Sequence, residues 1–132
     1  MRTMLRGVAV WLCIIIVETL HGIARTMFLA PALGDFQARQ VAVFTGSFLI
    51  LVVAISLIRW IRPTDAGQAV RVGMLWLVLT LVFEIAFGRY IVRASWARIA
   101  SDYNLLRGGL LPLGLLVLTA APLIAAKVRH VR

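Results

Sequence analysis

Apolar residues along this chain form four long blocks instead of alternating with polar ones. The blocks cover residues 5–30, 36–60, 68–92 and 103–126, and the stretch 41–58 carries no charged side chain. A helix needs about 20 residues to cross a hydrocarbon layer about 30 Å thick. Open strands cannot cross it, because their edge amides would stay unpaired in lipid. The pattern therefore predicts an all-α, four-helix transmembrane bundle in one membrane domain, residues 1–132.

The polar breaks between the blocks contain residues that stop and start helices. Pro31 and Pro63 follow the first and second blocks, and a proline cannot continue a helix without losing a hydrogen bond. An aspartate precedes each later block, where a short carboxylate can accept the free amides of a new helix. We expect these helix caps to be Asp35, Asp65 and Asp102.

The linker before the fourth block, residues 94–104, has the spacing of a short amphipathic helix. Trp96, Ile99 and Tyr103 recur at i, i+3 and i+7, which places them on one helix face. Aromatic side chains favour the headgroup layer of a bilayer. We therefore expect a short interfacial helix between the third and fourth spans, on the outer surface of the membrane.

The two halves of the chain share a pattern: Glu-x3-Gly, then Asp-aromatic-amide, then Arg-x6-Gly. The second copy follows the first at offsets of 66 to 68 residues, which predicts two helical hairpins repeated in parallel. Small residues let neighbouring helices approach closely. The predicted helix-packing positions are therefore Gly22 and Gly46 in the first half and Gly88 and Gly114 in the second. The pairs Ala42/Gly46 and Ala121/Ala125 are candidate faces for a homo-oligomer.

Composition and charge support a membrane location. Hydrophobic residues make up 62% of the chain and charged residues 14%, with a formal net charge of +9. The basic residues lie at helix ends and in short loops, not on one soluble face, so no nucleic-acid partner is expected. Eight basic residues fall on one side and six on the other, which places both termini in the cytoplasm. Because only Lys127 is a lysine, a bias typical of GC-rich bacterial genomes, the predicted location is a bacterial inner membrane.

Charged side chains also lie inside the predicted spans, where they are costly and commonly functional. Glu18, His21 and Arg25 recur at i, i+3 and i+7 and form one stripe along the first helix. Glu84 lies near the middle of the third span. We expect both glutamates to meet arginines that enter from the outer helix ends. The full predicted cluster is Glu18, His21, Arg25, Arg39, Glu84, Arg89 and Arg107.

Two interpretations of this polar layer stay open. Buried ion pairs can fix the register of helices in lipid, whereas the excess of arginine favours an anionic ligand or headgroup. Arginines beside Glu18 would keep it ionised, which argues against a proton carrier. The predicted function is a non-enzymatic membrane protein with a structural or anion-binding layer. A small oligomeric transporter or channel is the alternative, and an intramembrane enzyme is a third reading.

No catalytic residue, metal site or cofactor is predicted. Glu18, Glu84 and His21 could supply three metal ligands, but the arginines would repel the cation. The size of the chain and the glutamate in its first helix resemble small multidrug resistance exporters. The glutamate of those proteins has largely uncharged surroundings, whereas His21 and Arg25 share a helix face with Glu18 here. No family is assigned on this basis.

Overall fold

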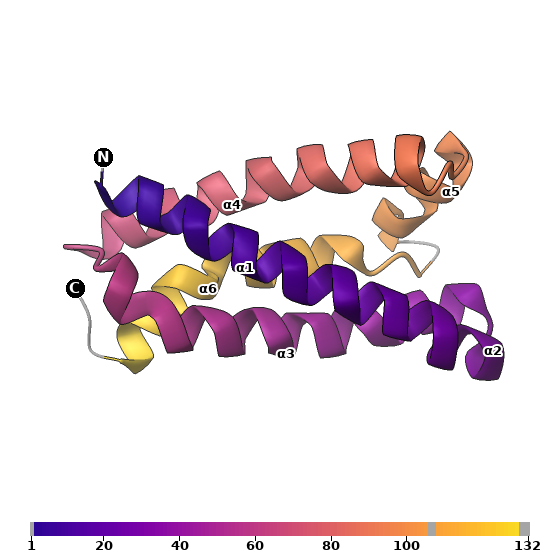
Figure 1. Ribbon diagram of the computed structural model, residues 1–132, viewed down its shortest axis with the longest axis horizontal. Helices are drawn as coiled ribbons and strands as arrows, with labels where there is room; N and C mark the ends of the chain where they lie inside the picture. The colour runs from indigo at the N-terminus through magenta and orange to yellow at the C-terminus, as the bar shows by residue number, and fades with distance from the viewer. Residues whose placement is uncertain (1, 106–107, 130–132) are drawn as a thin grey trace.

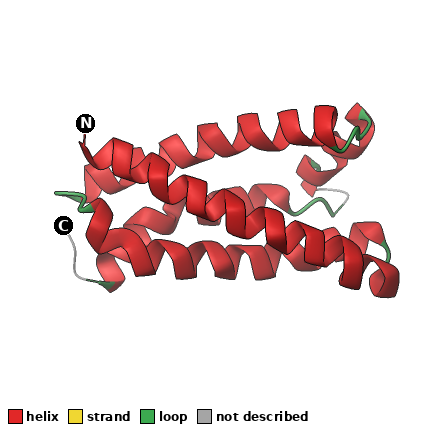
Figure 2. Ribbon diagram, in the orientation of Figure 1, coloured by secondary structure: helices red, strands yellow, loops and turns green. Residues whose placement is uncertain are grey.

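The computed structural model describes residues 2–105 and 108–129, and all regular structure in these ranges is helical (Figure 2). Two of the elements, η1 and η2, are π-helical turns that continue the preceding helices. The elements in order are α1 (Arg2–Ala24), η1 (Arg25–Leu29), α2 (Ala30–Leu33), α3 (Asp35–Ile61), α4 (Ala66–Ala86), η2 (Phe87–Ile91), α5 (Trp96–Tyr103) and α6 (Leu111–Val128).

Four continuous helical segments are long and apolar enough to cross a membrane, as expected of a multi-pass membrane protein. The second and third begin and end close to the predicted blocks. The first and fourth have different bounds, for reasons that hydropathy does not reveal. The four segments are Arg2–Leu33, Asp35–Ile61, Ala66–Ile91 and Leu111–Val128.

The first helix runs through Pro31 instead of ending there. Residues Arg25–Leu29 form a π turn, in which the amide of Ala30 donates to the carbonyl of Arg25. Pro31 then lies in the first turn of α2, where its fixed φ and missing amide are tolerated. The helix ends at Gly34, whose φ of 87° favours glycine.

The fourth span is shorter than predicted. Its helix begins at Leu111, because Tyr103 belongs to α5 and the chain turns at Gly108, with φ 89°. Pro112 lies in the first turn of α6, a position where proline is favoured. Hydropathy could not separate residues 104–110 from the start of the span, since three of these seven residues are leucine.

The four long helices run alternately up and down the bundle (Figure 1). α3 packs against α1 and α6, and α4 packs against the same two helices. The two hairpins therefore lie side by side, with α1 next to α4 and α3 next to α6. Two parallel repeats related by a twofold axis along the membrane normal would instead place α1 next to α6. α1 begins and α6 ends at one end of the bundle, here called the terminal end. The opposite end, which carries α2 and α5, is called the α5 end.

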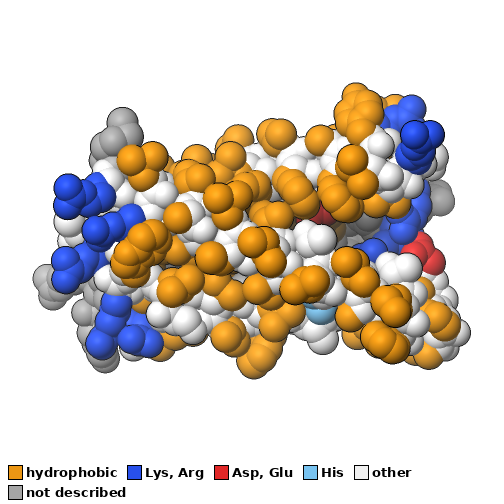
Figure 3. All heavy atoms as spheres, in the orientation of Figure 1, with side chains coloured by type: hydrophobic (Ala, Val, Ile, Leu, Met, Phe, Trp, Pro, Cys, Tyr) orange, Lys and Arg blue, Asp and Glu red, His pale blue; other side chains and the backbone are white. Residues whose placement is uncertain are grey.

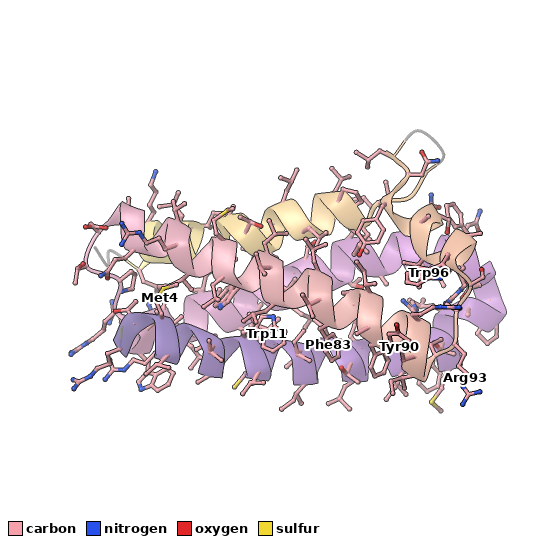
Figure 4. The ribbon with its side chains drawn as sticks, turned by 90° about the horizontal axis from the view of Figure 1, so that it is seen from above. Met4, Trp11, Phe83, Tyr90, Arg93 and Trp96 are labelled. Carbon is pink, nitrogen blue, oxygen red and sulfur yellow. The ribbon has the colours of Figure 1, made fainter. Side chains whose placement is uncertain are left out.

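The apolar core fills the terminal half of the bundle and contains two buried tryptophans. Trp76 Nε1 donates to the carbonyl of Gly7 at 2.8 Å, and Trp11 Nε1 donates to Thr80 Oγ1 at 2.9 Å. The Trp11 ring also meets Phe83 edge to face, with the ring centroids 6.2 Å apart (Figure 4). These contacts join α1 to α4. Around them lie Val10, Ile14, Ile50, Ala54, Ile58, Val72, Leu118, Ala121 and Ala125.

The glycine at the tightest helix contact is not one of the predicted four. A Cβ built on Gly73 of α4 would overlap the backbone carbonyl of Thr119 in α6. A Cβ on Gly22 would meet no atom within 4 Å, and one on Gly88 would make only ordinary contact with Ile99. Gly22 and Gly88 are therefore not needed for close packing. Ala69 and Gly73 form a small-x3-small pair that points to this contact from sequence.

Candidate functional site

A cavity of about 160 Å³ lies between α1, α3, α4 and α6. Its lining positions on α1 run from Ile14 to Arg25, about 16 Å along the helix axis, so it extends from mid-bundle toward the α5 end. Thr80, which accepts the hydrogen bond from Trp11, lines its deep end. One water needs about 10–15 Å³ of such a cavity. The space therefore holds about ten waters or a small polar ligand.

The cavity brings together most of the predicted polar cluster. Arg89 does not line it, and Arg107 lies outside the described residues. Three of the four predicted packing positions also line the cavity, one each on α1, α3 and α6. The lining residues among the predicted ones are Glu18, His21, Arg25, Arg39 and Glu84, with Gly22, Gly46 and Gly114.

Glu18 lies near the middle of the first span, and its carboxylate faces this cavity. Its ion-pair partner among the described residues is His21, whose Nδ1 is 3.7 Å from Glu18 Oε2, too far for a hydrogen bond. His21 Nε2 lies 2.6 Å from the hydroxyl of Thr45. No described residue donates a hydrogen bond to the buried Oε2 of Glu18. The pairing with Arg25 or Arg39 that we expected for Glu18 is thus not formed in this part of the chain.

Gly46 of α3 makes room for the Glu18 carboxylate. A Cβ at this position would lie 3.0 Å from Glu18 Oε1 and 3.4 Å from Oε2. A side chain here would force the carboxylate to move. Gly114 of α6 is different, because a Cβ there would be 3.4 Å from Val43 and in near-ordinary contact. Gly46 therefore leaves the space that the Glu18 carboxylate occupies. Sequence spacing alone did not distinguish this role from close packing between helices.

Asp35 links the α5 end of α3 to helix α5. Its carboxylate lies 3.1 Å from Arg39 Nε and 3.3 Å from an Arg98 nitrogen. Arg39 also donates to the hydroxyl of Ser101 at 3.4 Å. Asp35 is the first residue of α3, and Gly34 takes the N-cap position. The aspartate therefore holds two arginines rather than the orphan amides of its own helix.

The other two predicted caps have different positions. Asp65 is the N-cap of α4, and its Oδ1 accepts from the amide of Gln68 at 2.8 Å. Asp102 lies inside the last turn of α5 and so does not precede a helix. Ser95 is the N-cap of α5, and its hydroxyl accepts from the amide of Arg98. A capping aspartate cannot be told from sequence when the helix start itself is misplaced.

Arg89 lies outside the cavity. It donates to the carbonyl of Ala94 at 3.2 Å, and its guanidinium is 5.0 Å from the centroid of the Trp96 ring. It lies in the π turn η2, five residues after Glu84. Arg89 therefore anchors the start of α5 and does not join Glu84 in the cavity lining as we expected.

Three uncharged polar residues that were not among the predicted ones also line the cavity: Gln40, Ser47 and Thr80. Gln40 Nε2 donates to the carbonyl of Gly108 at 2.7 Å, which joins α3 to the segment before α6. Ser47 and Thr80 contribute hydroxyl groups. Gln40 and Ser47 are seven residues apart, and Thr80 is four residues before Glu84, so each pair shares a helix face. Polar residues at helical spacing inside an apolar span were the sequence pattern that could have predicted these lining positions.

The described residues bring no three potential metal ligands together. No protein-family model matches this sequence, and no curated protein or solved structure is significantly similar to it. Function therefore has to be inferred from the residues and geometry of the cavity, and not by analogy with a fold.

Proposed function

We propose that this chain is a non-enzymatic membrane protein that binds a small polar ligand in the cavity between its four long helices. The observation that carries the proposal is the Glu18 carboxylate, which faces a space of about 160 Å³ and has a buried oxygen to which no described residue donates a hydrogen bond. A charged group at mid-membrane costs about 2.5–3.5 kcal/mol or more. A ligand that donates a hydrogen bond to it would offset part of this cost.

This geometry favours ligand binding over a purely structural polar layer. Ion pairs that only fix helix register satisfy one another and need no space between them. Arg25 and Arg39 line the same cavity as the carboxylates, which supports the anion-binding part of the prediction. The Glu/Arg layer is therefore proposed to be a binding site with both signs of charge.

Glu18→Gln should leave the thermal unfolding temperature in detergent unchanged or slightly higher, as measured by circular dichroism. The substitution removes a charge from the bundle interior, and no donor among residues 2–105 and 108–129 loses its acceptor at Oε2. A structural ion pair predicts the opposite, because stranding the partner of a buried charge costs about 3–5 kcal/mol. Asp35→Asn is the comparison variant: its carboxylate contacts Arg39 and Arg98, so some stability should be lost. A loss for Glu18→Gln as large as about 3 kcal/mol would contradict the binding proposal.

We further propose that the protein lies in a bacterial inner membrane with its terminal end in the cytoplasm. Figure 3 shows basic side chains at both ends of the molecule and hydrophobic ones between them. The terminal end carries more of the described basic residues, which supports this orientation by the positive-inside rule. They are Arg2, Arg6, Arg59, Arg62, Arg71, Lys127 and Arg129. α5 would then lie in the outer headgroup layer, with Trp96 half exposed.

Reporter fusions test this orientation. A reporter inserted within residues 64–68 or placed after Arg132 should give a cytoplasmic signal. Reporters near Gly34 and Ser101 should give an outside signal, since both positions lie at the α5 end. Dual alkaline phosphatase and green fluorescent protein fusions provide the readout. A cytoplasmic signal at Gly34 is incompatible with four spans in this orientation.

The internal repeat and the homo-oligomer also stay predictions. Glu18 and Glu84, which the repeat makes equivalent, line one cavity from α1 and α4, and Gly46 and Gly114 do so from α3 and α6. This shared lining is compatible with the sequence repeat, although the hairpins are not arranged around a twofold axis along the membrane normal. The small-residue pairs considered for oligomer contacts are instead buried inside the chain: Ala42, Gly46, Ala121 and Ala125. A homo-oligomer would need another face.

A small transporter is the second candidate, and one observation favours it. The cavity extends toward the α5 end and stops at the core residues Trp11 and Thr80, so it is closed toward the terminal end. A cavity closed on one side is what one state of an alternating-access transporter has. Flux of a bound ligand across reconstituted vesicles would establish this function, whereas binding without flux leaves the first proposal in place.

A further inference from the structure

Charges of opposite sign lie at different depths in the cavity. On α1, Arg25 is seven residues beyond Glu18 toward the α5 end, a rise of about 10 Å. Helical side chains lean toward the helix N-terminus, which brings the two charged groups closer than this rise. α3 has the same order, because Gly46 adjoins the Glu18 carboxylate and Arg39 is seven residues nearer the α5 end. The deep part of the cavity is acidic and the outer part is basic.

Side chains of both signs line the described part of the cavity. Two carboxylates, of Glu18 and Glu84, and two guanidiniums, of Arg25 and Arg39, face it, and Arg39 also contacts the Asp35 carboxylate. A ligand with only a positive charge would be repelled by the arginines, and one with only a negative charge by the glutamates. A ligand with a positive group placed near the glutamates and a negative group placed near the arginines avoids both kinds of repulsion.

The cavity has an approach from the lipid side, between α1 and α4. The two helices are held together at Trp11 and Thr80 and separate beyond them toward the α5 end (Figure 1). Figure 3 shows acidic side-chain atoms deep between these helices, with hydrophobic side chains around them. The Glu18 side chain keeps 22% of its surface exposed, and space is open beside Gly22. An amphiphile can therefore place a headgroup in the cavity while its chains stay in lipid.

We propose that the cavity binds a zwitterion in which a primary ammonium and a phosphate are a few bonds apart, as in ethanolamine phospholipids and free phosphoethanolamine. The ammonium donates to Glu18 Oε2 beside the negative charge of Glu84, and the phosphate accepts from the guanidinium of Arg25, with the positive charge of Arg39 near it. Charge-assisted hydrogen bonds of this kind are about twice as strong as neutral ones. This inference rests on the proposed function and names its ligand class.

Native mass spectrometry of the full chain in detergent provides the test. The probes are short-chain phosphatidylethanolamine, phosphatidylcholine and phosphatidylglycerol, and free phosphoethanolamine as a competitor. Phosphatidylethanolamine should bind about tenfold more tightly than the other two lipids. The quaternary ammonium of phosphatidylcholine cannot donate a hydrogen bond, and phosphatidylglycerol has no cation. If free phosphoethanolamine competes, the headgroup alone is sufficient for binding. If the lipid binds and phosphoethanolamine does not compete, the ligand is a membrane lipid whose acyl chains are also needed.

Substitutions locate the binding. Glu18→Gln and Arg25→Gln should each weaken phosphatidylethanolamine binding by about tenfold. Arg93→Gln is the matched control, because Arg93 lies at the same end of the bundle and points away from it (Figure 4). The control should bind like the unmodified chain. Circular dichroism of each variant verifies that the helices are folded, and the two cavity variants provide independent tests if one of them fails to fold.

The outcomes separate this inference from the proposed function. Equal binding of all three lipids, lost when a larger side chain fills the cavity, would overturn the zwitterion and leave ligand binding in the cavity standing. Tightest binding of phosphatidylglycerol would do the same and would point to an anion. The absence of binding of any probe would overturn the inference. Lipid binding that no cavity substitution alters would overturn both the inference and the proposed function.

Discussion

Replacing Gly73 by alanine should destabilise the folded bundle by about 1–3 kcal/mol or more, the range for overpacked cores. The added methyl group would overlap the backbone carbonyl of Thr119. No side-chain rotation can relieve a clash with backbone, so α4 and α6 would have to move apart at this contact. Thermal unfolding in detergent, followed by circular dichroism, measures the loss.

Gly22→Ala makes the same chemical change where there is space. A Cβ at Gly22 meets no atom within 4 Å, and alanine is a better helix former than glycine by about 0.8–1 kcal/mol. This control should unfold at the same temperature as the unmodified chain or higher. If Gly73→Ala proved as stable as Gly22→Ala, the close contact between α4 and α6 would not exist in the folded protein.

Filling the cavity at Gly22 should abolish ligand binding without lowering stability. Gly22→Leu adds a side chain to a cavity-lining position that has open space beside it. The leucine would occupy the volume proposed for the headgroup, so binding of phosphatidylethanolamine should fall more than tenfold, a loss above about 1.4 kcal/mol. The unfolding temperature without lipid should be unchanged or higher, because leucine also favours the helix. Native mass spectrometry and thermal unfolding give the two readouts.

Gly88→Leu is the matched control for this loss. Gly88 holds the position equivalent to Gly22 in the predicted repeat, but it does not line the cavity and its neighbour is Ile99 of α5. Binding should therefore be kept in this variant. Loss of binding in Gly88→Leu together with full binding in Gly22→Leu would place the ligand site elsewhere on the molecule.

Hydropathy alone was enough to predict four helices of spanning length. Block length decides this feature, because a helix has to satisfy its own backbone in lipid whatever its neighbours are. The second and third predicted blocks, 36–60 and 68–92, correspond to the helices Asp35–Ile61 and Ala66–Ile91. The mid-span position of Glu18 and its shared stripe with His21 also follow from sequence, since helical periodicity is local.

Partners between helices required the tertiary structure. Glu18 faces a cavity beside Gly46 instead of an arginine, and Asp35 holds Arg39 and Arg98 instead of capping a helix. These outcomes depend on which helices are neighbours and on how far each is rotated. Hydropathy does not encode these rotations, because lipid is as apolar as the helix faces and close packing decides the contacts.

The sequence by itself determined the number of helices long and apolar enough to span a membrane, the amphipathic α5 and the positions of the charged groups along the helices, all of which follow from local composition and periodicity. The tertiary structure decided that α1 and α4 separate beyond Trp11, that Gly73 is the tight contact and that an open space remains beside Glu18. The physical reason is that volume between helices is a property of all four at once. A binding cavity exists only where their packing leaves room.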